Sequence, residues 1–486
     1  MTPPRPPLGS HPVSWGRKVV LAVIGLVGVL LLAAVALFGL VDTSVYKARL
    51  EAGISEALGM EVRVAGRMKI DFFPGLRVTL EDVHLRNQAA SVVSAKEATL
   101  AIGLMSVWAG KVRIESIGLQ QPVITIERSL DGRFNVEGSR EAADVFPAVD
   151  WPKVSFADGS IVYVDKRFGK GFEGRNCHLE LRRLRFQGGQ RSNLAKGISF
   201  TAQAGCTQVH KDGFILSDME FSADMKDGVL DLAPLTTRTF DTQGSGNLRA
   251  DFSGPVPLYR ADYTLSQFPI EAFLKTMSHK QVATGRMDFS ANLSTQGSTV
   301  TEMRQGMKGL VSLRGTNLTL SGSDLDREFE RFQSSQNFSL VDAGAFFFVG
   351  PLGLLVTKGY DFARIAQAQG GSSEIRALVS DWKVERGQAQ ASDVAMSTNK
   401  NRIALQGRLD LVNDQFDEVT MALVDAKGCV KVQQKIRGTF QNPAVEKPAL
   451  VTTLAGPALR LLKKGTDLLT GGHCDVFYAG SVAAPR

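Results

Sequence analysis

The chain has 486 residues, 44% of them hydrophobic, which is enough for two or three ordinary domains with substantial cores and excludes a disordered protein. Its net charge of +7 comes from 56 basic and 49 acidic residues spread along the whole chain, without a basic run of the kind that binds nucleic acid. Composition therefore gives no reason to expect nucleic acid as a partner.

The first strong feature is the apolar segment 19–41, which contains no charged or strongly polar side chain. At about 1.5 Å per residue, a helix of this length crosses the roughly 30 Å hydrocarbon core of a bilayer. Arg5, Arg17 and Lys18 precede it without an acidic residue, which predicts that residues 1–18 stay in the cytoplasm. The run is longer than the apolar region of a cleaved signal peptide, and no small-x-small site follows it. We therefore favour an uncleaved signal anchor over a cleaved signal peptide.

A short amphipathic helix is predicted directly after the anchor, because Leu50, Ile54 and Leu58 recur at helical spacing before Gly59. From Met60 onward, apolar residues alternate with polar ones in short runs that Gly, Asn and Asp separate. This pattern is typical of antiparallel strands joined by turns, and about two dozen such runs follow one another. The sequence therefore predicts a mainly β structure.

Later helices are predicted at 268–277, at 323–333 and at 447–469. For the last of these, a cap over an open end of the β structure is favoured over contact with a membrane surface. The apolar run 342–356 is too short to span a bilayer, and a buried strand and turn is favoured over a membrane-dipping loop. The helices are thus few and short.

No catalytic or cofactor motif accompanies these elements. The nucleophile elbow, the phosphate-binding loop and the HExxH motif do not occur in the sequence. The glycine-rich run GSGNLRA at Gly244 lacks a following helix and is interpreted as a turn between strands. We therefore expect no enzyme, no cofactor and no metal site, and we favour a binding or conduit protein.

Four cysteines form the even and sparse set that predicts disulfides in an oxidising compartment. Of the three possible pairings, the favoured one joins nearest neighbours, Cys177 with Cys206 and Cys429 with Cys474. A zinc site lacks the usual ligand spacing. His178 follows Cys177 directly, and neighbours in a strand point to opposite faces, which argues against cysteine–histidine catalysis. Disulfide formation is therefore the favoured role of all four cysteines.

An antiparallel sheet with this alternation must bury its apolar face. Because few helices are predicted to cover it, we expect the sheet to fold on itself as a sandwich, a barrel or a long curled trough, which periodicity does not distinguish. A trough would leave an apolar lining that lipid tails could occupy. The candidates for this lining are Ile70, Phe72, Val112, Ile114, Ile124, Ile126, Ile403 and Leu405.

Three stretches together resemble the AsmA family of bacterial envelope proteins. The first is the anchor followed by RLEAGISEALGMEVRVAGRMKIDFFPGLRVTLEDVHLRN and by AKEATLAIGLMSVWAGKVRIESIGLQQPVITIE. The second is MKGLVSLRGTNLTLSGSDLDREFERF. The third runs from GAFFFVGPLG through KGCVKVQQKIRGTFQNPAVEKP to CDVFYAGSV. The order of these motifs along the chain makes the resemblance specific.

The resemblance implies a single-pass protein of the bacterial inner membrane, with a cytoplasmic N-terminus and its bulk in the periplasm. It also implies an elongated antiparallel β-groove, similar to bridge-like lipid-transfer proteins, that assists phospholipid or another envelope lipid across the periplasm in outer-membrane biogenesis. Outer-membrane or periplasmic proteins would be further partners. The alternative is a membrane-tethered assembly or scaffold factor for outer-membrane proteins, which would be a closed sandwich without lipid conduction.

The expected organisation has five parts. They are a cytoplasmic tail (1–18), the anchor (19–41), an N-terminal AsmA-like β region (42–260), a C-terminal AsmA-like β region with short helices (261–440), and a helical cap with a disulfide-tied tail (441–486).

Overall fold

The computed structural model describes residues 47–48, 50–52, 54–55, 60–71, 75–87, 90–103, 114–132, 134–135, 145–146, 148–167, 169–187, 189–190, 194–211, 214–275, 283–321, 324–327, 329–330, 347, 371–447, 449–450 and 474–485. The predicted anchor at 19–41 lies outside these residues. Among the residues that are described, no helix is long and apolar enough to cross a bilayer.

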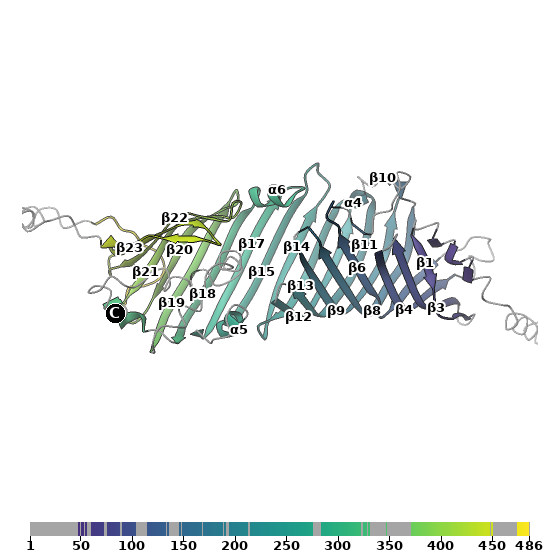
Figure 1. Ribbon diagram of the computed structural model, residues 1–486, viewed down its shortest axis with the longest axis horizontal. Helices are drawn as coiled ribbons and strands as arrows, with labels where there is room; N and C mark the ends of the chain where they lie inside the picture. Colours follow the sequence, from purple (N-terminus) through teal and green to yellow (C-terminus); the bar gives the residue numbers. More distant parts are fainter. Residues whose placement is uncertain are drawn as a thin grey trace, which may run out of the picture.

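A single sheet of 23 strands forms the body of the protein, and its strands succeed one another in chain order along the long axis (Figure 1). Two further short strands, β7 and β10, pair with each other. The strands are β1 (Glu61–Val64), β2 (Met68–Asp71), β3 (Leu76–Asn87), β4 (Ala90–Ile102), β5 (Ile114–Gln120), β6 (Val123–Arg128), β7 (Val145–Phe146), β8 (Val149–Asp165), β9 (Lys170–Phe186), β10 (Gly189–Gln190), β11 (Ile198–Lys211), β12 (Phe214–Lys226), β13 (Val229–Thr239), β14 (Thr242–Asp251), β15 (Leu258–Pro269), β16 (Ala283–Thr284), β17 (Arg286–Gln296), β18 (Lys308–Ser321), β19 (Ser372–Glu385), β20 (Gln388–Ser397), β21 (Arg402–Asp410), β22 (Gln415–Val424), β23 (Val430–Thr439), β24 (Pro443–Val445) and β25 (Ala449–Leu450). The prediction of a mainly β fold is therefore confirmed.

The sheet departs from the expected antiparallel pattern at one place. Strands β5 and β6 follow one another along β4, and β8 runs parallel to both of them. Parallel neighbours need a long connection, and the chain between Arg128 and Val149 is long enough to provide it. The alternation of apolar residues gave no sign of this crossover, because it is the same in parallel and antiparallel strands.

The described part includes three short helices, α4 (Leu194–Gly197), α5 (Ile270–Lys275) and α6 (Val300–Gln305). Helix α5 lies within the predicted helix 268–277, and residues 325–327 and 329–330 are helical within 323–333. Helix α6 was not predicted, although Thr299 and Glu302 form a capping box at its start. Of the predicted helix 447–469, residues 449–450 form β25 instead, and of the run 342–356 only Phe347 is described.

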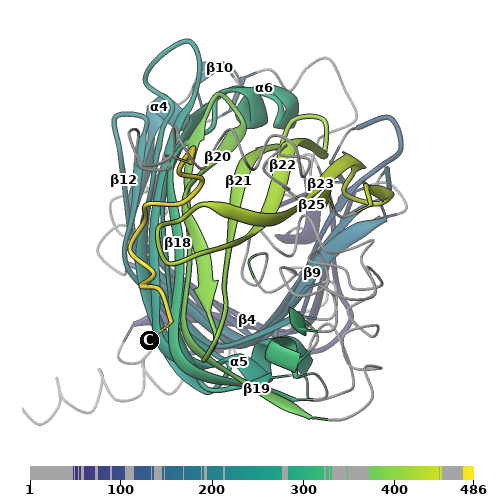
Figure 2. The same ribbon diagram turned by 90° about the vertical axis from the view of Figure 1, so that its left-hand side faces the viewer.

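The sheet curls about its long axis, so that its strands form a C-shaped wall when the molecule is seen end-on (Figure 2). Helix α5 lies on the inner side of this wall, and the last residues of the chain cross its outer side (Figure 2). Of the three shapes left open by the sequence, the curled trough is the one that the ribbon resembles.

Two regions of the sheet differ in how their inner side is filled. We call strands β2 to β14 the open region, and strands β15 to β23 together with α5 the closed end. The closed end contains the largest hydrophobic core, which joins residues of its strands to Phe273 of α5, Leu325, Phe329 and Phe347. Among its described residues, the open region has two small clusters of buried side chains, around Leu80 and around Phe156.

The glycine-rich run at Gly244 lies inside β14 and not in a turn, so this interpretation of the sequence was wrong. A Cβ atom at Gly244 would lie 2.1 Å from the hydroxyl of Tyr263 on the neighbouring strand. That hydroxyl is hydrogen-bonded to Oγ1 of Thr237 at 2.7 Å. The glycine is therefore explained by the close approach of a tyrosine, which a sequence pattern does not reveal.

Candidate functional site

The candidate site is the inner face of the sheet, where strand register aligns apolar side chains across nearly the whole molecule. In a sheet, residues directly opposite each other on neighbouring strands lie on the same face. Following the paired residues from strand to strand gives one row, the long row, in which every member is apolar or glycine. Its members are Ile70, Val78, Leu100, Ile117, Val154, Leu181, Ala202, Ala223, Leu232, Leu248, Ala261, Leu293, Gly309, Val384, Ala389, Leu409, Phe416 and Gly438.

A second row runs beside the long row, two residues away along most strands and therefore on the same face. Apart from the hydroxyl of Tyr263, it also consists of apolar residues and glycine, and with the long row it forms what we call the inner rows. Its members are Met68, Leu80, Ala98, Leu119, Phe156, Leu179, Ala204, Phe221, Leu235, Gly246, Tyr263, Ala291, Val311, Trp382 and Ala391.

The opposite face has the reverse character. One row of paired residues there, the outer row, contains only polar residues and one glycine. Its members are His178, Gly205, Glu220, Thr236, Ser245, Thr264, Ser290, Ser312, Asp381 and Asp393. From β9 to β20, the sheet thus carries an apolar row on one side and a polar row on the other.

The inner rows face the inside of the curl. Their members Val311, Trp382, Val384 and Leu409 belong to the same core cluster as Phe273 of α5, which lies on the inner side of the wall (Figure 2). In the open region, by contrast, the valines, leucines and isoleucines of the long row are half-buried or exposed. A contiguous apolar surface that is not covered by the rest of the protein is a common mark of a binding surface.

The predicted lining residues fall on this face where the structure describes them. Ile70 is a member of the long row and is 38% exposed, and Ile114 pairs with Ile102 at the end of β4. Ile124 packs against the cluster around Phe156, and Ile126 pairs with Tyr163. Phe72 and Val112 lie outside the described residues.

Ile403 and Leu405 also point to the inner side, but their surroundings differ. They are 1% and 2% exposed inside the large core of the closed end. The sequence placed them with Ile70 and Ile124 because all four belong to runs in which large apolar residues recur at every second position. The structure brings the four onto one face, but into two different environments.

The Cys177–Cys206 disulfide lies on the inner face of the open region. The two cysteines are directly opposite each other on β9 and β11, with their Cα atoms 4.0 Å apart, and both are buried. Phe156, Ile124 and Leu179 pack around them. The adjacent His178 is exposed on the other face, as the sequence predicted.

The second disulfide, Cys429–Cys474, ties the C-terminal residues 474–485 to the outer face of the closed end. We call these residues the C-terminal strap. Tyr478 and Val482 of the strap pack on a row of small side chains that includes Ala404 and Ala422. Both predicted disulfide pairs are thus present in the structure.

Hydrogen bonds hold the strap at two further points. Asp393 accepts hydrogen bonds from the hydroxyl of Tyr478 at 2.6 Å and from the hydroxyl of Ser481 at 2.6 Å. The buried Arg402 donates to the carbonyl oxygen of Val482 at 3.0 Å, and its guanidinium lies 5.3 Å from the ring centroid of Tyr478. Sequence reasoning missed these contacts, for which the aromatic pair after Cys474 was the only signal.

These contacts shift two pKa values. Burial alone would raise the pKa of Asp393, but the hydrogen bonds from Ser481 and Tyr478 outweigh it and hold this pKa below its usual value. Burial, together with the hydrogen bond to Asp393, raises the pKa of Tyr478. At neutral pH the pair therefore consists of a carboxylate and a protonated phenol.

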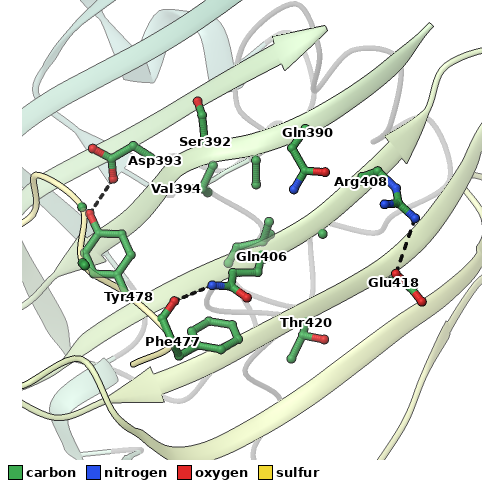
Figure 3. A pocket seen from close by; sticks show the side chains of 15 residues that line it. Gln390, Ser392, Asp393, Val394, Gln406, Arg408, Glu418, Thr420, Phe477 and Tyr478 are labelled. Carbon is green, nitrogen blue, oxygen red and sulfur yellow. Dashed lines mark hydrogen bonds and ion pairs between the residues drawn. The ribbon is translucent and has the colours of Figure 1, made fainter. Parts of the chain in front are cut away.

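An open pocket of about 620 Å³ lies beside the strap on the outer face of β20, β21 and β22 (Figure 3). Gln390, Gln406 and Arg408 line it on the strands, and Phe477 of the strap closes one side. The amide of Gln406 donates to the carbonyl oxygen of Phe477, and Arg408 is paired with Asp417 at 2.8 Å. Much of this polar lining is thus occupied by contacts within the protein.

The chemistry available on the inner face is that of apolar binding. Among the described residues, no group of three or more His, Cys, Asp and Glu side chains is placed to hold a metal ion. The arrangement can bury apolar ligand surface on one side of the sheet while the other side stays in water.

Comparison with known proteins gives one match. The sequence model of the AsmA family matches residues 15–195 and 181–341, which together span more than half of the 486 residues. No curated protein and no solved structure matches the chain. The chain belongs to the AsmA family.

Proposed function

We propose that this protein is an inner-membrane-anchored periplasmic protein that binds lipid acyl chains on the inner rows and assists phospholipid transfer in outer-membrane biogenesis. The observation that carries the proposal is the apolar face of the open region, which continues from strand to strand and stays half-exposed. Family membership supports an envelope role, either in outer-membrane biogenesis or in lipid transport.

The energetics favour an acyl chain as the occupant. Transfer of a methylene group from water to an apolar surface is worth about 0.8 kcal/mol, so a long chain gains several kcal/mol even when only part of it is covered. Because the polar outer row lies on the other face, a lipid bound inside would not meet buried charges. The segment 19–41 would place this surface next to the membrane that supplies the lipid.

The alternative function is a tethered scaffold for the assembly of outer-membrane proteins. It would use the polar outer face and the strap, and it needs no ligand on the inner face. The closed end is compatible with this role because its inner side is filled by its own core. The two functions therefore differ in whether lipid touches the open region.

Photocrosslinking tests the proposal in the full-length protein in bacterial membranes. Benzoylphenylalanine is introduced in place of Phe221, a half-buried member of the second inner row, and separately in place of its neighbour Glu220 in the outer row. Light should join phospholipid to the protein at position 221 and not at position 220, because adjacent strand residues face opposite sides. Lipid is detected by mass spectrometry of the crosslinked peptide.

Non-reducing electrophoresis provides the control for folding, since both disulfides form only when distant segments are correctly placed. A protein with intact disulfides that gives no lipid adduct at position 221 would rule out lipid binding on this face. It would leave the scaffold role as the better account.

A pair of charge substitutions gives an independent check. Ile124→Asp should lower the amount of phospholipid that co-purifies with the protein, because a carboxylate facing acyl chains is costly to desolvate. Thr125→Asp should leave it unchanged, since the next residue of the strand points to the opposite face. Equal lipid recovery from both variants would contradict the proposal.

A further inference from the structure

The inner rows do not offer the same surface along the whole sheet. In the open region, every Val, Leu and Ile of the long row from β3 through β14 is half-buried. At the start of the closed end the same row is still accessible, since Ala261 of β15 is exposed and Leu293 of β17 is half-buried against the core. From β19 on it is covered: Val384 is 1% exposed, and Ala389 and Leu409 are each 0% exposed. The row of apolar residues therefore continues into the closed end, but from β19 on its side chains are no longer accessible to a ligand.

The protein itself covers the row in the closed end. Phe416 packs edge-on against Phe440 at a centroid distance of 5.1 Å, where the last strands curl inward (Figure 2). Phe347 lies in the same core, and its carbonyl oxygen accepts a hydrogen bond from the buried Ser380 hydroxyl at 2.7 Å. Side chains of this closed end therefore already make the apolar contacts that a ligand would make.

Three aromatic rings mark the boundary between the two regions. Phe240, in the turn between β13 and β14, lies 5.9 Å from Phe268 and 5.6 Å from Phe273 of α5, measured between ring centroids. Phe268 and Phe273 are buried in the core of the closed end, and Phe240 packs against that core while remaining partly exposed. At this end of the strands, the open region thus meets the core of the closed end through an aromatic cluster.

We propose that the inner face is a compartment closed at its C-terminal end, so that acyl chains occupy β3 to β14, reach at most the accessible part of the long row on β15 and β17, and do not pass through the core of the closed end. The inference rests on the proposed function. Eight strand spacings of about 4.8 Å make the part from β3 to β14 about 38 Å long. Lipid then enters and leaves across the open side of the curl or at the membrane-proximal end. The protein acts as a holder with lateral exchange and not as an end-to-end conduit.

The experiment compares benzoylphenylalanine at phenylalanine positions of the two regions, in the full-length protein in bacterial membranes. Phe221 probes the open region, Phe416 probes the long row in the closed end, and Phe289 is a second position in the closed end. Phenylalanine is the residue closest in shape to the photoreactive amino acid. Intact disulfides and resistance to protease show which variants fold.

We expect phospholipid adducts at position 221 and at least tenfold fewer at positions 416 and 289. Adducts of similar yield at position 221 and at either closed-end position, in a folded variant, would overturn the inference while leaving the proposed function standing. Absence of adducts at all three positions would reject the proposed function itself. If the variant at position 416 does not fold, position 289 decides the question alone.

Discussion

The open region and the closed end are built from the same alternating sequence pattern, and yet their inner faces differ in how far they are buried. Leu181 and Leu409 belong to one continuous row, but Leu181 is half-buried while Leu409 is 0% exposed. The difference comes from whether other parts of the protein pack against the row on the inner side of the sheet. In the closed end, α5, Phe347 and the inward curl of the last strands fill the space. Strand periodicity thus determines which side chains face inward, and tertiary packing determines whether that face is core or binding surface.

The largest expected effect comes from placing a carboxylate in each region. Leu409→Asp should destabilise the protein by more than about 4 kcal/mol, because it buries an unpaired charge in a packed core. Leu181→Asp should cost about 1 to 2 kcal/mol, since water reaches that position. Urea denaturation followed by tryptophan fluorescence measures both, with Leu→Ala at each position as the size control. Equal costs would contradict the division into open and closed regions.

Each of the two regions contains one disulfide, which allows a second comparison between them. By the chain-entropy estimate, the Cys429–Cys474 bridge, with a sequence separation of 45, contributes about 4 kcal/mol, and the Cys177–Cys206 bridge, with a separation of 29, contributes about 3.6 kcal/mol. These figures are upper values if the reduced chain keeps structure. The energies are similar, but the structural consequences should differ.

Replacing Cys177 and Cys206 by Ala should lower the melting temperature while β9 and β11 stay in register, because their backbone hydrogen bonds remain. Replacing Cys429 and Cys474 by Ala should in addition release the C-terminal strap. Limited proteolysis followed by mass spectrometry should then show early cleavage within residues 474–485 in the second variant only. An uncleaved strap in the second variant would show that it does not depend on its own bridge, and early cleavage in both variants would show that the Cys177–Cys206 bridge also holds it.

Acid should loosen the strap through Asp393. Its pKa in the folded protein lies below the usual value of 3.8, so the stabilisation from its hydrogen bonds is complete above that value and is lost as pH falls through the lower, folded pKa. Asp393→Asn should remove this acid dependence and cost about 1.5 to 3 kcal/mol at neutral pH, the usual value of a hydrogen bond to a charged group. Thermal melts between pH 2 and pH 7 measure both effects. If the melting temperature of the variant falls at low pH as much as that of the parent, other carboxylates cause the loss of stability in acid.

Much of the fold was predictable from the sequence because the responsible forces are local. Alternation placed Ile70, Ile124 and Ile403 on the inner face, and the sparse cysteines predicted both bridges. The closure of the C-terminal end was not predictable, since Ile403 and Ile70 have the same local pattern and differ only in contacts with distant residues. One signal was present: Ala404 and Ala422 place small residues on the outer side of the closed end, where the strap packs.

The smallest effects are expected on the outer face, where the two regions can be compared through their ion pairs. In the open region, Arg249 and Asp231 are 2.7 Å apart, with exposures of 47% and 45%. In the closed end, Arg314 and Asp381 are 2.5 Å apart, but Asp381 is only 18% exposed and also accepts a hydrogen bond from Ser312. Double-mutant cycles should give a coupling of about 0.2 to 1 kcal/mol for the first pair, falling further in salt.

The second pair should be coupled more strongly and should resist salt better, because its carboxylate is partly desolvated and shared with a hydroxyl. The free energy of unfolding of each single and double alanine variant, measured at low and high salt, gives both couplings. If the two coupling energies were equal, the tighter packing of the closed end would affect only its inner side. A clear difference would show that the packing that fills the inner face also orders the polar contacts on the outer face of the same strands.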